Sequence, residues 1–159
     1  MRAKSKYQRA KRRRLKTQQL EVKTGRLGNP KCKVQNAVLV EAAKAAARRA
    51  YAPYSKFRVG AAVRTKSGKV FAGCNVENAS YGLTICAERA AIFAAVAAGE
   101  REFEQIVIFT PTQSFTGPCG ACRQVVAEFA PELEVVLVNE QGRTRSYSLR
   151  KLLPVLFEL

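Results

Sequence analysis

The chain has 159 residues, 47% of them hydrophobic, which fits one globular domain with a sizeable core. Its sequence contains no apolar run near the roughly 20 residues that cross a bilayer, and its N-terminus lacks the apolar core of a secretory signal. These features argue against a membrane protein, and we expect a cytoplasmic one.

The net charge of +16 is concentrated at one end of the sequence. Residues 1–34 carry thirteen Lys/Arg and one acid, whereas the remaining 125 residues carry fifteen bases and eleven acids. We interpret residues 1–34 as a mobile basic extension, because few large apolar side chains are present to offset the entropy lost on ordering. A breaker, Gly28-Asn29-Pro30, lies near its end, and residues 35–159 form the predicted folded domain.

Three roles fit the basic extension. The first is a solvated segment without function. The second is a segment that binds nucleic acid or another acidic surface. The third is an organellar or nuclear targeting segment. Tyr7 is its single aromatic residue, which argues against base stacking.

The first predicted elements are a helix and a hairpin. Good helix formers with apolar residues at helical spacing predict a helix over 34–51, ended by Pro53. Two β-rich runs, 57–65 and 69–76, are joined by a Gly-containing turn and predict a β-hairpin.

Helices and strands then alternate to the end of the chain. The sequence predicts helices over 86–98 and 119–130, buried strands over 105–110 and 133–139, a last hairpin arm over 143–148, and a short helix ending in Leu152-Leu153-Pro154. This alternation implies a layered α/β fold.

Three cysteines form the candidate metal site. Cys119 and Cys122 are three residues apart, which places both sulfurs on one side of a helical turn. They and Cys86 lie at predicted helix N-termini, where thiolates form more readily. Catalytic zinc takes three protein ligands, whereas structural zinc usually takes four. Since the chain has no histidine, we expect an open site with one Zn²⁺ per chain.

The two other cysteines lie in unrelated contexts. Cys74 is expected to be a small buried hydrophobe, and Cys32 has no assigned role.

Two residues beside Cys86 add chemistry to the cluster. Glu88 is expected to carry protons between water and substrate. Arg89 is expected to donate hydrogen bonds to ligand sulfurs and offset the charge of three thiolates, although a solvated helix charge also fits it. Cys119 and Cys122 alone also fit a redox pair or part of a structural zinc site, and Cys86 with Glu88 favours zinc catalysis.

Four ordered motifs between about Ala42 and Phe157 carry a resemblance to a known family. They are Phe57-Arg58-Val59-Gly60-Ala61-Ala62, Gly73-Cys74-Asn75-Val76-Glu77-Asn78, Cys86-Ala87-Glu88-Arg89, and Gly117-Pro118-Cys119-Gly120-Ala121-Cys122-Arg123-Gln124. Together they resemble the free-nucleoside cytidine deaminases, zinc enzymes with a non-ligand glutamate and a Pro-Cys-x-x-Cys segment.

The resemblance implies a fold, an assembly and a reaction. The fold is a three-layer α-β-α sandwich with a mixed sheet of about five strands, and the assembly is a homotetramer. The reaction is hydrolysis of cytidine and deoxycytidine to uridine and deoxyuridine in pyrimidine salvage, with zinc-bound hydroxide attacking C4 and Glu88 shuttling protons. Cys86, Cys119 and Cys122 are then the zinc ligands.

The resemblance also implies which residues bind the nucleoside. Asn75 and Glu77 match a pair that binds ribose hydroxyls, and Phe57 matches a phenylalanine that packs on the pyrimidine. Residues matching Ala79, Tyr81 and Phe157 reach into a neighbouring subunit's pocket, and Ala87 is assigned to the same substrate-binding set. Without the resemblance, Phe57 fits a core position and the Asn75 and Glu77 pair fits the end of a sheet.

A function of another class is the alternative. The chain is then a nucleic-acid-binding or polynucleotide-editing protein with the basic extension as its binding element. We expect contact with nucleic acid only through residues 1–34.

Overall fold

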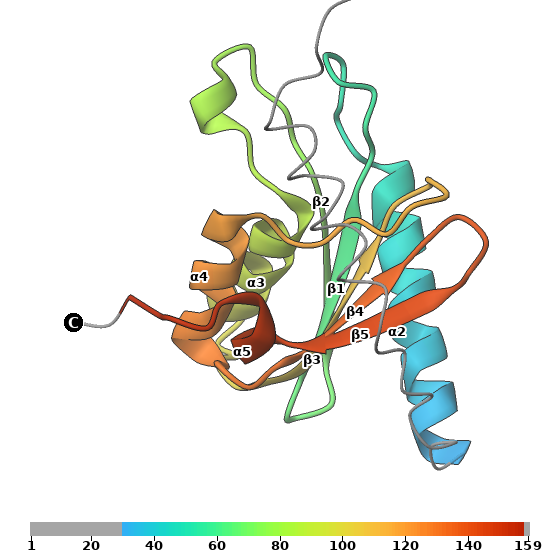
Figure 1. Cartoon of the computed structure of the whole chain (residues 1–159), viewed down its shortest axis with the longest axis vertical. Helices are drawn as coiled ribbons and strands as arrows, with labels where there is room; N and C mark the ends of the chain where they lie inside the picture. Colours follow the sequence, from blue (N-terminus) through green and yellow to red (C-terminus); the bar gives the residue numbers. More distant parts are fainter. Residues whose placement is uncertain (1–29, 158–159) are drawn as a thin grey trace, which may run out of the picture. The chain divides into compact units, whose positions relative to one another are not determined.

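The computed structural model describes the backbone of residues 30–157 and the side chains of residues 36–157. Five strands form one sheet in the order β2-β1-β3-β4-β5 (Figure 1). The strands are β1 (Gly60–Thr65), β2 (Val70–Cys74), β3 (Phe103–Phe109), β4 (Glu134–Val138) and β5 (Thr144–Ser148). Strands β3 and β4 run parallel and the other neighbouring pairs run antiparallel, so the sheet is mixed.

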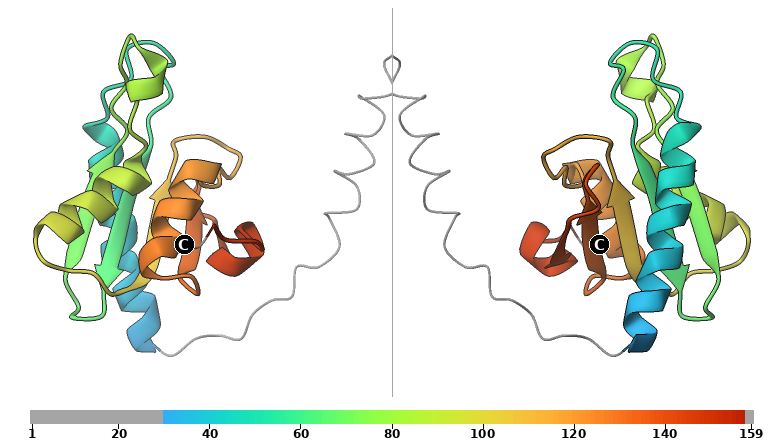
Figure 2. Two further views of the ribbon diagram at one scale, coloured as in Figure 1. Left: turned by 90° about the vertical axis from the view of Figure 1, so that its left-hand side faces the viewer. Right: turned by 90° about the vertical axis from the view of Figure 1, so that its right-hand side faces the viewer.

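Helices cover both faces of this sheet. They are α2 (Pro30–Arg48), α3 (Ala87–Ala97), α4 (Gly120–Phe129) and the short α5 (Leu149–Leu152), with a 3₁₀ turn, η1, at Tyr81–Leu83. The sheet separates α2 from α3 and α4 (Figure 2). The predicted layered α/β fold with a mixed five-stranded sheet is confirmed. Among the helices that the structure describes, none is both long and apolar enough to span a membrane.

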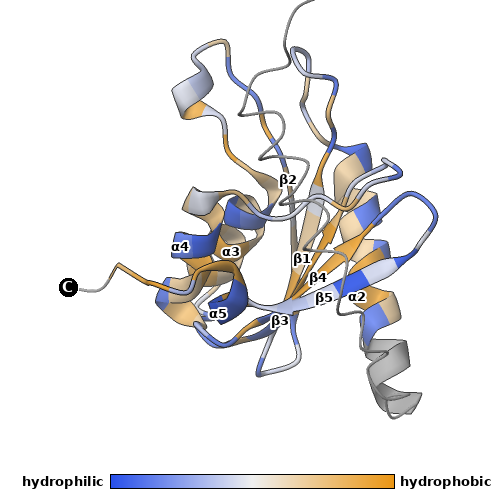
Figure 3. Cartoon of the chain, in the orientation of Figure 1, coloured by the Kyte–Doolittle hydropathy of each residue, from blue (hydrophilic) through white to orange (hydrophobic). Residues whose placement is uncertain are grey.

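Alternating side chains of the central strands form two cores, because successive residues of a strand point to opposite faces. In β1, Ala61 and Val63 pack on the side of α3 and α4, whereas Ala62 packs on the side of α2. The same alternation in β3 puts Val107 in the α2 core and Ile106 in the other. The three central strands are therefore mainly hydrophobic, apart from polar residues at one end of the sheet (Figure 3).

Two glycines allow the helices to approach the sheet backbone. A Cβ at Gly60 would lie 1.9 Å from the carbonyl oxygen of Ala43 in α2. A Cβ at Gly73 would lie 2.4 Å from the backbone nitrogen of Ala91 in α3. Real Cβ atoms do not approach other atoms this closely, so both contacts require glycine.

Three element boundaries differ from the predictions by three residues or more. Helix α2 begins at Pro30, inside the predicted extension, because proline suits the first turn of a helix as well as it suits a breaker. It ends at Arg48 rather than residue 51, since the amide of Tyr51 donates instead to the carbonyl of Asn75. Strand β1 begins at Gly60 rather than residue 57, and η1 was not predicted.

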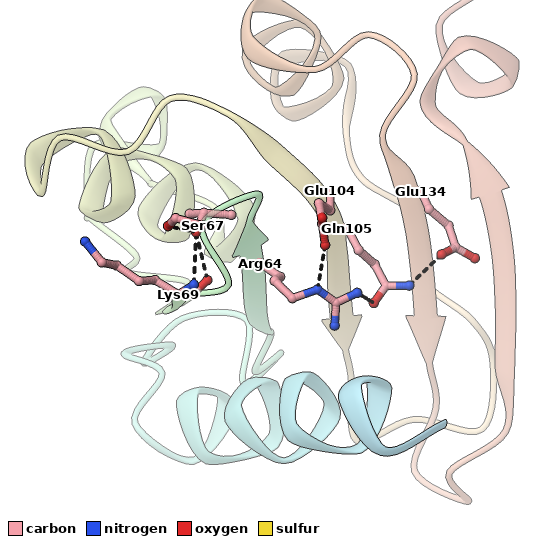
Figure 4. A network of polar contacts seen from close by, with 7 residues as sticks. Arg64, Ser67, Lys69, Glu104, Gln105 and Glu134 are labelled. Carbon is pink, nitrogen blue, oxygen red and sulfur yellow. Dashed lines mark hydrogen bonds and ion pairs between the residues drawn. The ribbon is translucent and has the colours of Figure 1, made fainter. Parts of the chain in front are cut away.

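The β1–β2 turn and the first residues of β3 and β4 form the end of the sheet far from the predicted metal cysteines. There Arg64 pairs with Glu104 at 3.0 Å and also donates to Gln105, which donates in turn to Glu134 (Figure 4). Side chains at this end therefore bond mainly to one another.

Candidate active site

Three cysteine sulfurs meet where α3 and α4 begin. Cys86 is the N-cap of α3 and Cys119 is the N-cap of α4, both with extended backbone, and the two helices pack against each other. Cys122 lies in the first turn of α4 and is fully buried. Their thiols therefore stand where the first N–H groups of both helices have no intrahelical partner.

The spacing of these sulfurs fits a zinc ion. Sγ of Cys119 lies 3.9 Å from Sγ of Cys86 and 3.5 Å from Sγ of Cys122, and all three lie within 4.8 Å of one another. Zinc–sulfur bonds of about 2.3 Å at tetrahedral angles separate two ligand sulfurs by about 3.8 Å. Within residues 36–157, no other three Cys, Asp or Glu side chains are grouped closely enough to share an ion.

The cysteines also have the electrostatics of a cation site. Hydrogen bonding with Cys122, and then with Arg89, lowers the pKa of Cys86 to about 5. The same contact with Cys86, together with burial, raises the pKa of Cys122. The lowered pKa favours the thiolate form of Cys86, which is the form that binds zinc.

Glu88 is a buried carboxyl beside the cysteines. It is the second residue of α3, and only 5% of its surface is exposed. Burial raises the pKa of Glu88, and the charge of Cys86 adds to that effect. A carboxyl with a raised pKa exchanges protons more readily near neutral pH, which suits a general acid and base.

Arg89 links the metal cluster to the loop before α3. Its Nη2 lies 3.6 Å from Sγ of Cys86 and donates to the carbonyl of Thr84 at 3.1 Å. Nε of Arg89 is buried without a partner among the described residues. The guanidinium thus lies against the sulfur rather than in solvent, where it places positive charge beside the thiolates.

The predicted ribose-binding residues, Asn75 and Glu77, hold the loop that carries Phe57. Asn75 is 8% exposed, accepts a hydrogen bond from the amide of Val59 and donates one to the carbonyl of Phe57, both at 2.8 Å. This contact explains why β1 begins at Gly60, because the backbone of the preceding residues is bonded to a side chain instead of a strand.

Glu77 holds the first half of the same loop. Its carboxylate accepts hydrogen bonds from the amides of Tyr54 at 2.9 Å and Ser55 at 3.2 Å, and from the Ser55 hydroxyl. The Ser55 hydroxyl is the main cause of a lowered pKa at Glu77. The amide of Phe57 donates to Ser55 Oγ at 3.0 Å, and the residue as a whole is 37% exposed. Phe57 is therefore presented on the loop and not packed in either core.

The other predicted substrate residues lie in three different settings. Ala79 and Tyr81 are exposed on the loop between β2 and α3, and the Tyr81 ring packs edge-on against Tyr54. Phe157 is 69% exposed in the segment after α5. Ala87 is fully buried in the core, with neither its methyl group nor its backbone exposed.

Sequence reasoning missed the residues that connect these parts by contacts to backbone. Thr84 accepts from Arg89, and Ser55 bridges Glu77 to Phe57. Arg123 and Gln124 bond to the C-terminal segment. Arg123 and Gln124 directly follow the Pro-Cys-x-x-Cys residues in the sequence, but nothing in the sequence indicated what they bond to.

Some predictions fall on other parts of the chain. Cys74 is half-buried at the end of β2 rather than fully buried. Residues 1–29 of the predicted extension and the side chain of Cys32 lie outside the described residues. An open surface hollow of about 290 Å³ lies between Lys66, Phe129 and Leu133, away from the cysteines.

Residues 33–138 match the model of the cytidine and deoxycytidylate deaminase zinc-binding region. The chain is 50% identical over 119 residues to a probable cytidine deaminase of Dictyostelium discoideum. This match covers 74% of this chain and 80% of the relative. It is 45% identical over 120 residues to a cytidine deaminase of Sporosarcina psychrophila, covering 75% and 88% of the two chains.

A solved structure agrees with these sequence relatives. The crystal structure of cytidine deaminase from Burkholderia pseudomallei has 59% sequence identity and a TM-score of 0.73, and the match covers 76% of this chain and 98% of that one. With the spacing of the three sulfurs, the match to a zinc-binding region confirms the expected zinc cofactor.

Proposed function

This chain belongs to the cytidine and deoxycytidylate deaminase family, and on that premise we propose that it hydrolyses cytidine and deoxycytidine to uridine and deoxyuridine. The observation that carries the proposal is the buried carboxyl of Glu88 next to three sulfurs spaced for zinc. This combination supplies a water-activating metal site and a proton carrier at one point, which is what deamination of a cytosine ring requires.

The reaction adds water to C4 of the base and releases the amino group as ammonia. Cys86, Cys119 and Cys122 would hold the zinc ion, which would supply a Lewis acid that activates water. Glu88 accepts the proton that the water loses on attack and delivers it to the ring nitrogen N3. It then accepts the proton of the new C4 hydroxyl and delivers it to the departing amine. The C4–N bond breaks as the C4–O carbonyl forms, so the carboxyl ends the cycle as it began.

Arg89 adjusts the charge of this site. Three thiolates on a divalent cation leave a net negative charge, which weakens the cation as a Lewis acid. A hydrogen bond from Arg89 to the Cys86 sulfur withdraws part of that charge. Arg89 thus acts through a ligand and not on the substrate.

The loop held by Asn75 and Glu77 is the proposed nucleoside-binding element. Phe57 lies on it with its ring accessible to a pyrimidine. One hydrogen of the Asn75 amide and further lone pairs of Glu77 remain for ribose hydroxyls once their loop contacts are made. These two residues then shape the loop and bind the sugar.

We propose a homotetramer in which neighbouring subunits complete the pockets through Ala79, Tyr81 and Phe157. The support is a set of large apolar residues that one chain leaves exposed, on the loops between residues 51 and 83 and in the segment after α5, namely Tyr51, Tyr54, Val76, Tyr81, Leu83 and Phe157. Large apolar residues exposed together on a surface mark sites that bind another protein. The proposed setting is pyrimidine salvage in the cytoplasm.

The nucleic-acid alternative is not favoured. It depends on residues 1–34, whereas the family match begins at residue 33 and contains the metal cluster. Salt-insensitive and equal polynucleotide binding by the whole chain and by a chain without residues 1–34 would remove it altogether.

The test compares Glu88→Gln with the wild-type protein on free cytidine, followed by loss of cytidine absorbance. Glutamine keeps the shape of the side chain but cannot accept and release a proton, so we expect kcat to fall by about 10²- to 10⁴-fold while zinc stays near one per chain. Glu128→Gln, at an exposed carboxylate of α4, is the matched control and should keep full activity. A wild-type protein with full zinc and no deamination would overturn the proposal.

A further inference from the structure

We propose that Gln124 is a positioning residue for nucleoside binding, because its side-chain amide holds the backbone of Phe157 and sets where that ring is presented. This inference rests on the proposed function, in which Phe157 contributes to a substrate pocket. It adds a residue to which sequence and similarity assigned no role.

The contact between these two residues is reciprocal. Nε2 of Gln124 donates to the carbonyl of Phe157 at 3.0 Å, and the amide of Phe157 donates to Oε1 of Gln124 at 3.3 Å. One side chain thus pairs both polar groups of a single residue, as a neighbouring strand would. The segment from residue 153 to residue 157 has no helix or strand of its own, so this pairing replaces regular secondary structure there.

Arg123 fixes the beginning of the same segment. Its Nη1 donates to the carbonyl of Leu152 at 2.7 Å, and its Nε donates to the carbonyl of Pro118 at 2.9 Å. Pro118 directly precedes Cys119. Consecutive residues of α4 therefore tie the C-terminal segment, at residues 152 and 157, to the helix that carries two of the metal-binding cysteines.

Packing alone does not orient the ring of Phe157. Leu153 and Leu156 pack against the core, whereas Val155 and Phe157 are 83% and 69% exposed. The leucines hold the segment close to the domain, but the place from which the Phe157 ring projects is set by its own backbone. Since Gln124 bonds both polar groups of that backbone, it fixes the direction of the Cα–Cβ bond, and the ring then takes one of the few allowed rotamers.

The kinetic test uses Gln124→Ala and Gln124→Glu. Alanine removes both hydrogen bonds, and glutamate keeps the acceptor but sets a carboxylate against the Phe157 carbonyl. We expect KM for cytidine to rise about three- to tenfold in both variants, with kcat and zinc content unchanged, since one or two hydrogen bonds carry an effect of this size. Gln141→Ala, at an exposed glutamine in the turn after β4, should leave KM unchanged.

A double-mutant cycle shows whether Gln124 acts through Phe157. Adding Gln124→Ala to Phe157→Ala should raise KM little beyond Phe157→Ala alone, because the ring to be positioned is already gone. Independent, multiplying effects of the two changes on KM would overturn the proposal. So would a fall in kcat with KM unchanged.

Hydrogen exchange tests the contact without any assay of activity. The amide of Phe157 should exchange faster in Gln124→Ala than in the wild type, while the amide of Leu153, which bonds to the carbonyl of Leu149, serves as the internal reference. Unchanged exchange at Phe157 would overturn the contact itself. If exchange rises in a protein that does not deaminate cytidine, the proposed function fails while the contact stands, so the two failures are distinguishable.

Discussion

The two ends of the sheet use polar side chains in different ways. At the end near the cysteines, several side chains bond to loop backbone: Asn75 to the residues around Phe57, and Asn139 to the carbonyl of Gln113 in the loop before Cys119. At the opposite end, side chains bond mainly to side chains, as in the pair of Arg64 and Glu104, although Thr65 also bonds to the backbone of Lys69.

This difference has a physical basis. A side chain that satisfies backbone groups fixes the path of a loop, and leaving such buried groups unpaired is costly. An ion pair near solvent gains little free energy and permits several geometries. The end that holds the proposed catalytic groups therefore relies more on the first kind of contact, and the opposite end relies more on the second.

Among changes that test this difference between the two ends, the largest effect on zinc content and activity is expected in the three-cysteine site. Cys122→Ser places a hydroxyl where zinc prefers a thiolate, so metal content should fall well below one zinc per chain. Deamination should fall by more than the roughly 10- to 100-fold that changes around metal ligands produce. Cys74→Ser, at the half-buried cysteine of β2, is the matched control. Full zinc in Cys122→Ser and loss of zinc in Cys74→Ser would contradict the site.

A smaller effect, on stability and on KM, is expected from Asn75→Ala. It removes two hydrogen bonds of 2.8 Å from a buried position and leaves the partner groups around Phe57 unpaired, which should lower the free energy of unfolding by about 2–3 kcal/mol. KM for cytidine should rise as the loop loosens. Denaturant titrations at fixed protein and zinc concentration measure the first effect.

Asn36→Ala is the matched control for that measurement. Oδ1 of Asn36 is buried without a partner among the described residues, and the residue lies in α2. Alanine should therefore leave stability unchanged or raise it slightly. Equal losses in Asn75→Ala and Asn36→Ala would show that contacts to the loop backbone have no special weight.

The smallest effect is expected at the opposite end of the sheet. Glu104→Gln breaks an ion pair whose glutamate side chain is 48% exposed, so unfolding free energy should change by less than about 1 kcal/mol. Values of kcat and KM should stay at those of the wild type. A loss larger than that of Asn75→Ala would reverse the contrast between the two ends.

Local sequence patterns were sufficient to predict the order and type of nearly all the elements. Helix formers after Cys86 and Cys119, and apolar runs such as Gln105–Thr110, indicate elements whose type does not depend on distant contacts. The grouping of the three cysteines was predicted from the same patterns, because the sequence placed Cys86 and Cys119 at the beginnings of two helices.

The remaining features depend on contacts between distant residues. Phe57, Arg58 and Val59 have strand-forming character, but the side chain of Asn75 engages their backbone first. Gln124 and Phe157 are separated by 33 positions, and no periodicity connects them. A side chain that bonds to remote backbone leaves no mark in the spacing of residues, so sequence patterns alone could not predict these contacts.

Gly73 has a consequence for how the protein tolerates mutation. It has no side chain to take part in chemistry, yet its missing Cβ lets the backbone of α3 rest on β2 at Ala91. A methyl group at this position would push α3 away from β2, and with it Cys86 and Glu88 at the beginning of that helix. A mutational scan should therefore find that Gly73 tolerates no other residue. The close packing of β2 on α3 at this glycine keeps Cys86 and Glu88 beside the cysteines of α4.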